Sequence, residues 1–183
     1  MTVHIVPIDL PDYGFFEALG SAVEDELPIE CTIAKPVPIP DEAYDPDRGQ
    51  FRAEVLLRHS VEVWRGRSGN SASGRTSELV MAVVDEDLYA GDLNFVLGLA
   101  EPGKSACIVA LARLHAERSF RHPDPERFFD RAVKESVHEL GHLLGLPHCP
   151  NPSCVMHFSN MLAHTDRKSR SLCERCRRKT KST

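Results

Sequence analysis

The sequence predicts an α/β fold: a three-layer core around a mixed, mostly parallel five-stranded sheet, with one long helix and a small C-terminal subdomain. The chain opens with alternating strand-like and helix-like patterns, which is typical of parallel strands covered by helices. Its later apolar runs are joined by connections too short for a crossover helix, which indicates antiparallel pairing at one edge. The 183 residues are enough for a single domain with a sizeable core.

The first half of the chain alternates apolar runs of strand length with helical stripes. Residues 3–8 and 29–34 are predicted to be strands, and the apolar spacing of residues 13–27 predicts a helix between them. Residues 35–49 are rich in proline and acidic side chains, so we expect a surface loop that contributes nothing to the core. The apolar stripe in residues 50–64 predicts the next helix.

Three further apolar runs of strand length complete the predicted sheet, at residues 79–84, 95–99 and 106–111. Turn-forming residues separate them, including Pro102 and Gly103 before the last run. Because the last connection is short, the last two strands are expected to pair with each other directly.

The long helix is the most clearly marked element. Asp124 is a suitable N-cap, and Pro125 would occupy the first helical position. An apolar stripe follows and stops at Gly145, with Pro147 just beyond it. We therefore expect a helix at about residues 125–144.

Composition excludes several classes of protein. With 42% hydrophobic residues, 11 glycines and 13 prolines, the chain is neither collagen-like nor disordered. No apolar stretch approaches the roughly 20 residues of a membrane-spanning helix, and no basic run precedes an apolar segment at the N-terminus. Six cysteines without a signal sequence favour a reducing compartment. We therefore expect a cytoplasmic monomer with no cleaved signal and no membrane partner.

The strongest chemical signal is the string HELGHLLGLPH, which starts at residue 138. His138 and His142 are four residues apart, so on a helix both imidazoles project from one face and can reach the same metal ion. Glu139 lies off that face and can act as the general base, taking the proton of an attacking water.

Gly145 can adopt a positive φ and turn the chain sharply out of the helix. That turn can bring His148 round as a third ligand. Three neutral imidazoles leave a zinc ion its full charge and an open coordination position, which is typical of a catalytic site and not of a closed structural one. The pattern therefore predicts a catalytic zinc with Glu139 as the catalytic residue.

The complete motif resembles that of the metzincin metallopeptidases, because Met156 follows the third histidine. Cys149 directly after that histidine, Cys154, and the pair Cys173 and Cys176 narrow the resemblance to the archaemetzincin family. The resemblance implies a metzincin-like core with a long active-site helix, and a zinc metallopeptidase that hydrolyses peptide substrates, with aminopeptidase-like cleavage as one form of the activity. A catalytically silent metzincin fold is an alternative.

The resemblance also implies a division of the single catalytic domain, residues 1–183, into an upper subdomain of about 1–145 and a C-terminal subdomain of about 146–183. Met156 would lie in the Met-turn, an apolar floor beneath the catalytic zinc, although ordinary core packing also explains a single methionine. Some metzincins place a tyrosine two residues after this methionine, where this chain has Phe158. An oxyanion donor would then come from elsewhere, and the weak candidates are two histidines: His157 and His164.

Four cysteines form a second metal-binding pattern. Cys149 and Cys154 have four residues between them, and Cys173 and Cys176 have two, which matches a closed tetrahedral zinc site. The chain would thus hold two zinc ions, one catalytic and one structural, and the structural ion would hold the C-terminal subdomain together. Disulfide bonds between these cysteines are the alternative. Basic residues are placed in sequence to offset the charge of four thiolates: Lys168, Arg175, Arg177 and Arg178.

The basic C-terminal segment suggests a different class of function. The net charge is −5, yet residues 166–183 carry eight Lys and Arg against two acidic residues. Next to a four-cysteine site this could mark a zinc-ribbon-like nucleic-acid-binding protein. No aromatic residue follows Phe158 to stack on bases, so nucleic acid is not the expected partner.

The eight residues from Gly98 to Ser105 match the phosphate-loop pattern of nucleotide hydrolases. Such a loop needs a helix directly after it. Residues 106–111 look like a strand, although their alanines and leucine leave a helix possible. A P-loop-like nucleotide hydrolase is therefore a remote alternative, and we expect a tight turn at residues 101–104. In the metzincin interpretation residues 94–99 form an edge strand that a peptide substrate could extend.

Overall fold

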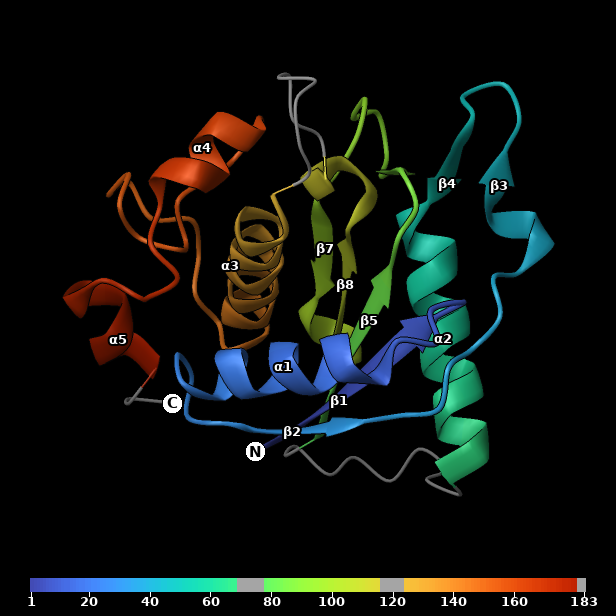
Figure 1. The fold of residues 1–183 in the computed structure, drawn as a ribbon, viewed down its shortest axis with the longest axis horizontal. Coiled ribbons are helices and arrows are strands. Elements are labelled where there is room, and N and C mark those ends of the chain that lie inside the picture. Colours follow the sequence, from blue (N-terminus) through green and yellow to red (C-terminus); the bar gives the residue numbers. More distant parts are fainter. Residues whose placement is uncertain (69–77, 116–123, 181–183) are drawn as a thin grey trace.

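The computed structural model describes residues 1–68, 78–115 and 124–180, and it confirms the predicted α/β class (Figure 1). Within these ranges no helix is both long and apolar enough to cross a membrane. The elements in chain order are β1 (Thr2–Ile8), α1 (Tyr13–Glu24), β2 (Glu30–Ile33), η1 (Asp41–Ala43), β3 (Tyr44–Asp45), β4 (Gln50–Arg52), α2 (Ala53–Ser68), β5 (Glu78–Val84), β6 (Leu88–Tyr89), β7 (Gly98–Glu101), η2 (Pro102–Lys104), β8 (Ala106–Ala110), η3 (Ala112–His115), α3 (Pro125–Leu143), α4 (Leu162–Arg167) and α5 (Glu174–Thr180).

The main sheet has five strands in the order β2-β1-β5-β8-β7. The first four run parallel, and β7 is antiparallel to β8, with Gly98 opposite Val109. The sheet is thus mixed and mostly parallel, as predicted. β7 is antiparallel to β8 because the connection between them is too short for a crossover helix, and it forms one edge of the sheet.

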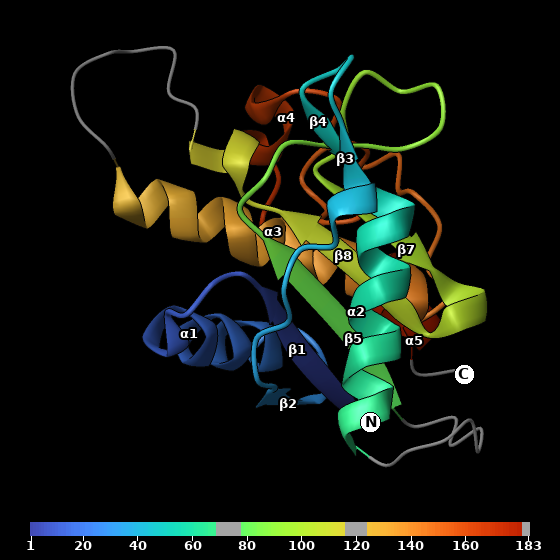
Figure 2. The same cartoon turned by 90° about the vertical axis from the view of Figure 1, so that its right-hand side faces the viewer.

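Helices cover both faces of this sheet (Figures 1 and 2). Val3 and Ile5 of β1 pack in one core with α1 and α3, whereas Val6 and Ile8 pack in a second core with α2. Successive side chains of a strand point to opposite faces, so a strand buried on both faces is apolar throughout. The result is the predicted three-layer arrangement.

A second, three-stranded sheet of order β3-β4-β6 corrects the prediction for residues 50–64. Its strand β4 takes up the first three of these residues, so α2 begins only at Ala53 and then continues to Ser68. Phe51 donates its backbone N–H to the Asp87 carbonyl (2.9 Å). This partner is far away in the sequence, so local periodicity gives no sign of the pairing.

Residues 35–49 run over the surface for most of their length, but the prediction that they stay out of the core is wrong at several positions. Val37 and Ala43 are fully buried in the core beneath α2. The Val37 backbone donates to the Pro7 carbonyl (2.9 Å) and accepts from the Asp9 N–H (2.9 Å). The segment is therefore drawn inward because it continues alongside the end of β1.

The region that resembles a phosphate loop contains no such loop. The strand predicted at residues 95–99 is shifted to β7, and the predicted tight turn becomes the short helix η2 with Ser105 at φ +53°. The residues that follow, β8, form a central strand between β5 and β7. Because no helix N-terminus faces the loop, the nucleotide-hydrolase alternative is wrong.

The long helix α3 agrees with its sequence signals. The Asp124 side chain accepts a hydrogen bond from the Arg127 N–H (3.0 Å), which is the expected N-cap. Gly145 follows the helix with φ +80°, a conformation that only glycine adopts without strain. Figure 1 shows α4 and α5 on the side of α3 that faces away from the sheet.

An ion pair with one buried partner ties α3 to α4. Arg131 of α3 is only 4% exposed, and its guanidinium donates to both carboxylate oxygens of Asp166 in α4 (2.7 and 2.9 Å). The Arg131 guanidinium holds the pKa of Asp166 below its ordinary value. A bidentate pair with one buried partner is a strong contact, and removing one member leaves the other uncompensated.

We predict that Asp166→Asn lowers the free energy of unfolding at pH 7 by about 2 kcal/mol. Because the folded pKa of Asp166 lies below the unfolded one, its stabilisation is present above about pH 4 and is lost as the pH falls through the folded pKa. The difference between wild type and variant should therefore shrink towards pH 3 in urea unfolding curves. Asp47→Asn, at an exposed position, is the control. A difference that is constant from pH 7 to pH 3 would contradict this assignment.

Candidate metal centre

Three histidines from one helix and the turn after it converge on one point. His138 and His142 project from α3, and the turn at Gly145 brings His148 back towards them. One nitrogen from each ring lies within 4.8 Å of the others. The structure therefore brings together all three histidines that the sequence predicted for this site.

Backbone carbonyl groups fix how two of these rings are oriented. Nδ1–H of His138 donates to the Val155 carbonyl and Nδ1–H of His142 donates to the Leu146 carbonyl, each at 2.8 Å. A carbonyl oxygen can only accept, so in each neutral ring Nε2 carries no hydrogen. These two Nε2 atoms face each other at 3.2 Å. Two lone pairs this close repel unless a cation lies between them, so the donor set fits a zinc ion.

Burial keeps the three rings ready to bind a metal. It lowers the pKa of His138 to about 3, and the Lys168 charge nearby adds to this effect. Burial also lowers the pKa of His142 and of His148. All three rings are therefore neutral at pH 7, which is the form that ligates a metal.

Glu139 lies beside the histidines with its carboxyl group in a nearly dry environment. Its side chain is 6% exposed and lines the cleft described below. Burial, with a contribution from the neighbouring charge of Glu135, raises the pKa of Glu139 to about 8. A carboxyl group with a pKa near neutrality suits proton transfer at physiological pH, and a bound cation would favour its ionised form.

Sequence reasoning missed a second buried carboxylate, Glu135, one turn before Glu139 on α3. It is 3% exposed, and its Oε1 accepts from the Thr165 hydroxyl (2.9 Å) and lies 3.0 Å from Nζ of Lys168. Lys168, whose side chain is fully buried, therefore pairs with Glu135 and not with the cysteine cluster, which corrects the prediction for this residue. The spacing of four residues from Glu139 was the available signal.

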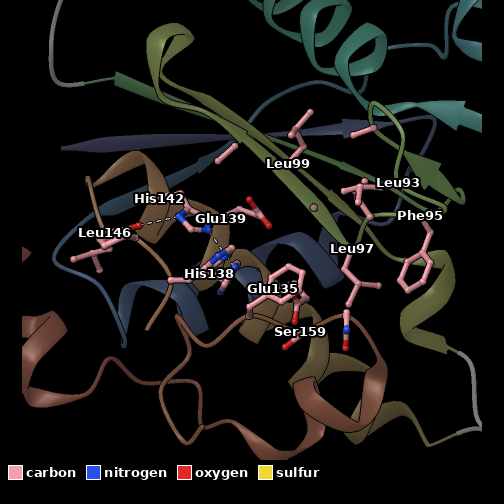
Figure 3. Close-up of a pocket in the computed structure, with 18 of the residues that line it drawn as sticks. Leu93, Phe95, Leu97, Leu99, Glu135, His138, Glu139, His142, Leu146 and Ser159 are labelled. Atoms are coloured by element: carbon pink, nitrogen blue, oxygen red, sulfur yellow. Dashed lines mark hydrogen bonds between the residues drawn. The ribbon is translucent and has the colours of Figure 1, made fainter. Parts of the chain in front are cut away.

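A cleft of about 760 Å³ opens beside these residues (Figure 3). The histidines, Glu135 and Glu139 form one wall. The opposite wall is mostly apolar and consists of residues 93–97 and the first part of β7. Phe158 also lines the cleft, whereas His157 and His164 are not among its lining residues. The His157 ring instead donates to the Cys149 carbonyl (2.9 Å), so neither histidine is placed to donate to an oxyanion.

Met156 packs directly under the helix that carries the histidines. It is fully buried, and a Cβ added to Gly141 would collide with its sulfur. Gly141 directly precedes His142, so the methionine supports the backbone of the turn of α3 that carries His142. Sequence patterns gave no reason for a glycine at this position in the helix.

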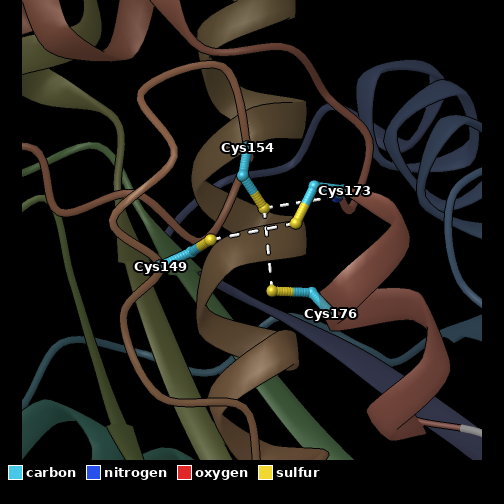
Figure 4. Close-up of side chains that lie close together, drawn as sticks. All are labelled: Cys149, Cys154, Cys173 and Cys176. Carbon is cyan, nitrogen blue, oxygen red and sulfur yellow. Dashed lines mark hydrogen bonds between the residues drawn. The ribbon is translucent and has the colours of Figure 1, made fainter.

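The four predicted cysteines form a compact cluster against α3 (Figure 4). Their sulfur atoms are 3.8 Å apart for Cys149 and Cys173 and 3.9 Å apart for Cys154 and Cys176. A disulfide needs about 2.05 Å, and all six cysteines of the chain are free. Zinc–sulfur bonds of about 2.3 Å place sulfurs roughly 3.8 Å apart in a tetrahedron. The cluster therefore fits one zinc ion.

Nearby donors favour the thiolate form of one cysteine of the cluster, whereas burial raises the pKa of Cys154 and of Cys176. Hydrogen bonding, chiefly from backbone at Cys176, lowers the pKa of Cys173 to about 7. Arg175 donates from Nη2 to Cys149 Sγ (3.3 Å), as the predicted charge compensation requires. Arg177 instead donates to the Leu172 carbonyl, and Arg178 pairs with Glu174 on the surface. Arg175 thus donates a side-chain hydrogen bond to a cysteine sulfur, whereas the hydrogen bond from Arg177 to Cys173 comes from its backbone N–H.

Known proteins match both the sequence and the fold. The sequence profile of peptidase family M54 matches residues 24–182. The archaemetzincin of Methanopyrus kandleri is 44% identical over 162 residues, which cover 88% of this chain and 81% of that protein. The crystal structure of a zinc-dependent peptidase from Methanocorpusculum labreanum superimposes with a TM-score of 0.86 at 29% identity, covering 97% of this chain and 99% of that one. The archaemetzincin structure from M. kandleri gives 0.80 at 34% identity, covering 100% and 94%.

We predict that the purified protein binds two zinc ions per chain and that the two sites can be emptied separately. His142→Ala should reduce the content to one ion, because a ligand of the histidine site is lost, and should leave the melting temperature nearly unchanged. Cys176→Ser should also leave one ion but should lower the melting temperature by about 5 °C or more, because the cluster holds the C-terminal segment. Elemental analysis and thermal unfolding measure both effects. Two ions in either variant would contradict the assigned ligands.

Proposed function

Because this chain belongs to the archaemetzincin family, peptidase family M54, it is a zinc-dependent metallopeptidase, and we propose that three histidines hold its catalytic zinc: His138, His142 and His148. The facing, unprotonated Nε2 atoms of His138 and His142, 3.2 Å apart, carry this proposal. We further propose that Glu139 is the general base, since it lies beside these rings and lines the cleft.

Zinc, when bound there, supplies Lewis-acid polarisation of the scissile carbonyl and makes a water more acidic. Glu139 removes one proton from the attacking water as the new carbon–oxygen bond forms. It then delivers that proton to the amide nitrogen as the carbon–nitrogen bond breaks, so that an amine leaves and a carboxyl group remains. The apolar wall of the cleft limits the water around the reacting groups.

We propose that the peptide substrate lies along β7 in an extended conformation. β7 is the edge strand of the main sheet, and its residues Gly98, Leu99 and Ala100 line the cleft. An edge strand offers unpaired main-chain groups on one side, so a substrate can pair with it as an additional strand. The apolar residues at positions 93–97 favour substrates with apolar side chains near the cleaved bond.

Aminopeptidase-like cleavage is a narrower form of this proposal. An enzyme that removes N-terminal residues needs a negative group to hold the free α-amine. Glu135 is the candidate because it lines the cleft one helical turn from Glu139. Lys168 and Thr165 both contact its Oε1, so the amine would meet the other oxygen, Oε2.

We also propose that the second zinc is structural, bound by the cluster of Cys149, Cys154, Cys173 and Cys176, and that the enzyme is a cytoplasmic monomer. Free thiols at metal-binding separations suit a reducing compartment. The segment after residue 145 joins the main core through Leu146, Val155 and Met156. This continuity supports one catalytic domain in which the C-terminal subdomain rests on the upper one.

Glu139→Ala is predicted to remove peptide hydrolysis while leaving both zinc ions bound, because Glu139 transfers protons and is not a ligand. We expect kcat to fall by about 1,000-fold or more, the usual size of a lost general base. The probe is an internally quenched peptide with apolar residues on both sides of the cleaved bond. Glu42→Ala, an exposed position, is the control. Wild-type turnover in Glu139→Ala would remove Glu139 from this role.

The aminopeptidase-like form predicts that N-terminal acetylation of a substrate abolishes its cleavage. The same peptide is compared with a free and with an acetylated N-terminus, and the products are identified by mass spectrometry. If Glu135 holds the amine, Glu135→Gln should raise KM for the free peptide by about 10-fold, because a charged partner is lost. Equal cleavage of both peptides at an internal bond would show an endopeptidase instead.

A further inference from the structure

We propose that Gly98 is a positioning residue for the general base: because position 98 has no Cβ, the Glu139 carboxylate can lie against the backbone of β7. This inference rests on the proposed role of Glu139. It also assigns a role to the first glycine of the segment that resembles a phosphate loop, a motif that the peptidase function leaves unexplained.

The contact between Gly98 and Glu139 leaves no room for a methyl group. A Cβ built on Gly98 would lie 2.6 Å from both Cγ and Oε1 of Glu139 and 2.8 Å from Cδ. Separations below 3.0 Å do not occur between such atoms, so something would have to move. Figure 3 shows the Glu139 side chain reaching from α3 towards the strands at the edge of the sheet.

Backbone conformation does not explain this glycine. Among the described residues, the glycines with positive φ are Gly49, Gly91 and Gly145. Gly98 is not one of them, so its φ suits any L-amino acid. It starts a regular strand, where a glycine normally weakens the pairing. The close approach of the Glu139 side chain is therefore the feature that requires a glycine at this position.

The strand cannot easily move away from the helix. Gly98 is paired with Val109 of β8, and just before it the Ala110 N–H donates to the Leu97 carbonyl (2.9 Å). β8 in turn is held on its other side by β5. A shift of β7 would break these ladder bonds or displace a central strand of the core.

The segment before Gly98 is anchored as well. Gln50 donates from Nε2 to the Asn94 carbonyl, and Arg48 donates from Nη2 to the Leu93 carbonyl, each at 2.9 Å. The Arg113 guanidinium lies 4.1 Å from the ring centre of Phe95. These contacts tie the wall of the cleft to the second sheet and to η3, so this wall acts as a fixed surface.

The helix is fixed from its other side. Met156 packs against Gly141, and the His138 ring is bonded to the Val155 carbonyl. With strand and helix both held, the part that can yield is the Glu139 side chain, which has rotatable bonds. A methyl group at position 98 would therefore displace the carboxylate and leave the fold intact. A misplacement of about 1 Å can reduce turnover about 100-fold.

The test compares four zinc-loaded proteins with the wild type: Gly98→Ala, Glu139→Ala, the double variant, and Gly103→Ala as control. Gly103 lies in the same hairpin, and a Cβ there would meet no atom within 4 Å. Crystal structures locate the Glu139 carboxylate, thermal unfolding gives the melting temperature, and kcat and KM are measured with the quenched peptide.

We expect the Glu139 carboxylate of Gly98→Ala to move by about 1 Å or more, and kcat to fall about 100-fold while KM stays within about twofold. Its melting temperature should stay within about 3 °C of the wild type, and Gly103→Ala should match the wild type throughout. In the Glu139→Ala background, where the crowded atoms are gone, adding Gly98→Ala should change neither melting temperature nor residual turnover.

Two results would overturn the inference. One is a Gly98→Ala structure in which the carboxylate keeps its place, or in which β7 moves instead. The other concerns the case in which Gly98→Ala does not fold. The double variant should then fold as Glu139→Ala does, because the crowded atoms are gone. If the double variant does not fold either, the methyl group meets some group other than Glu139. Full turnover in Glu139→Ala alone would refute the general-base role, whereas the carboxylate position still decides the contact itself.

Discussion

The site depends on two hydrogen bonds from imidazole to backbone, those from Nδ1 of His138 to Val155 and from Nδ1 of His142 to Leu146. They determine which nitrogen of each ring carries no hydrogen and where its lone pair points. The facing lone pairs then form a site that a cation stabilises. Both acceptors belong to the chain after the helix, which has little regular structure of its own. The Val155 N–H donates to the Ser171 carbonyl, close to Cys173. The cysteine cluster thus stabilises the histidine site through the backbone that orients its rings.

The same segment also carries Lys168, whose positive charge lies next to the buried carboxyl groups of the cleft. Glu135 and Glu139 are buried one turn apart on α3, and Lys168, directly after α4, is buried as well. The Lys168 ammonium lies 3.0 Å from Oε1 of Glu135 and offsets part of its charge, while burial raises the pKa of Glu139 to about 8, which suits Glu139 for proton exchange with a substrate. The residue after the lysine, Ser169, donates its N–H to the Ser153 carbonyl (3.0 Å). One stretch of backbone therefore contributes both to ring orientation and to local charge.

The sequence predicted what depends on neighbours in the chain and missed what depends on distant ones. The apolar runs that are buried on both faces identified the strands of the main sheet, and Asp124 marked the start of α3. The two- and three-residue strands of the second sheet left no periodic signal, because their pairing joins positions such as Phe51 and Leu88. Lys168 lies among surface basic residues in the sequence, so its burial against Glu135 could not be foreseen. The spacing of the histidines sufficed because an α-helix fixes their separation.

The match to a phosphate loop shows why residues must be interpreted together with their surroundings. In a phosphate loop, glycine, lysine and serine act on one ligand at the start of a helix. Here each has a separate partner: Gly98 makes room for the Glu139 side chain, Lys104 pairs with Glu101 (2.6 Å), and Ser105 takes the left-handed conformation that leads into β8. In a phosphate loop the glycine allows a phosphate to approach the backbone, and here Gly98 allows a carboxyl group of the same protein to do so. Both approaches require a residue without a Cβ. What distinguishes them is the element that follows the loop, and here β8 is a strand.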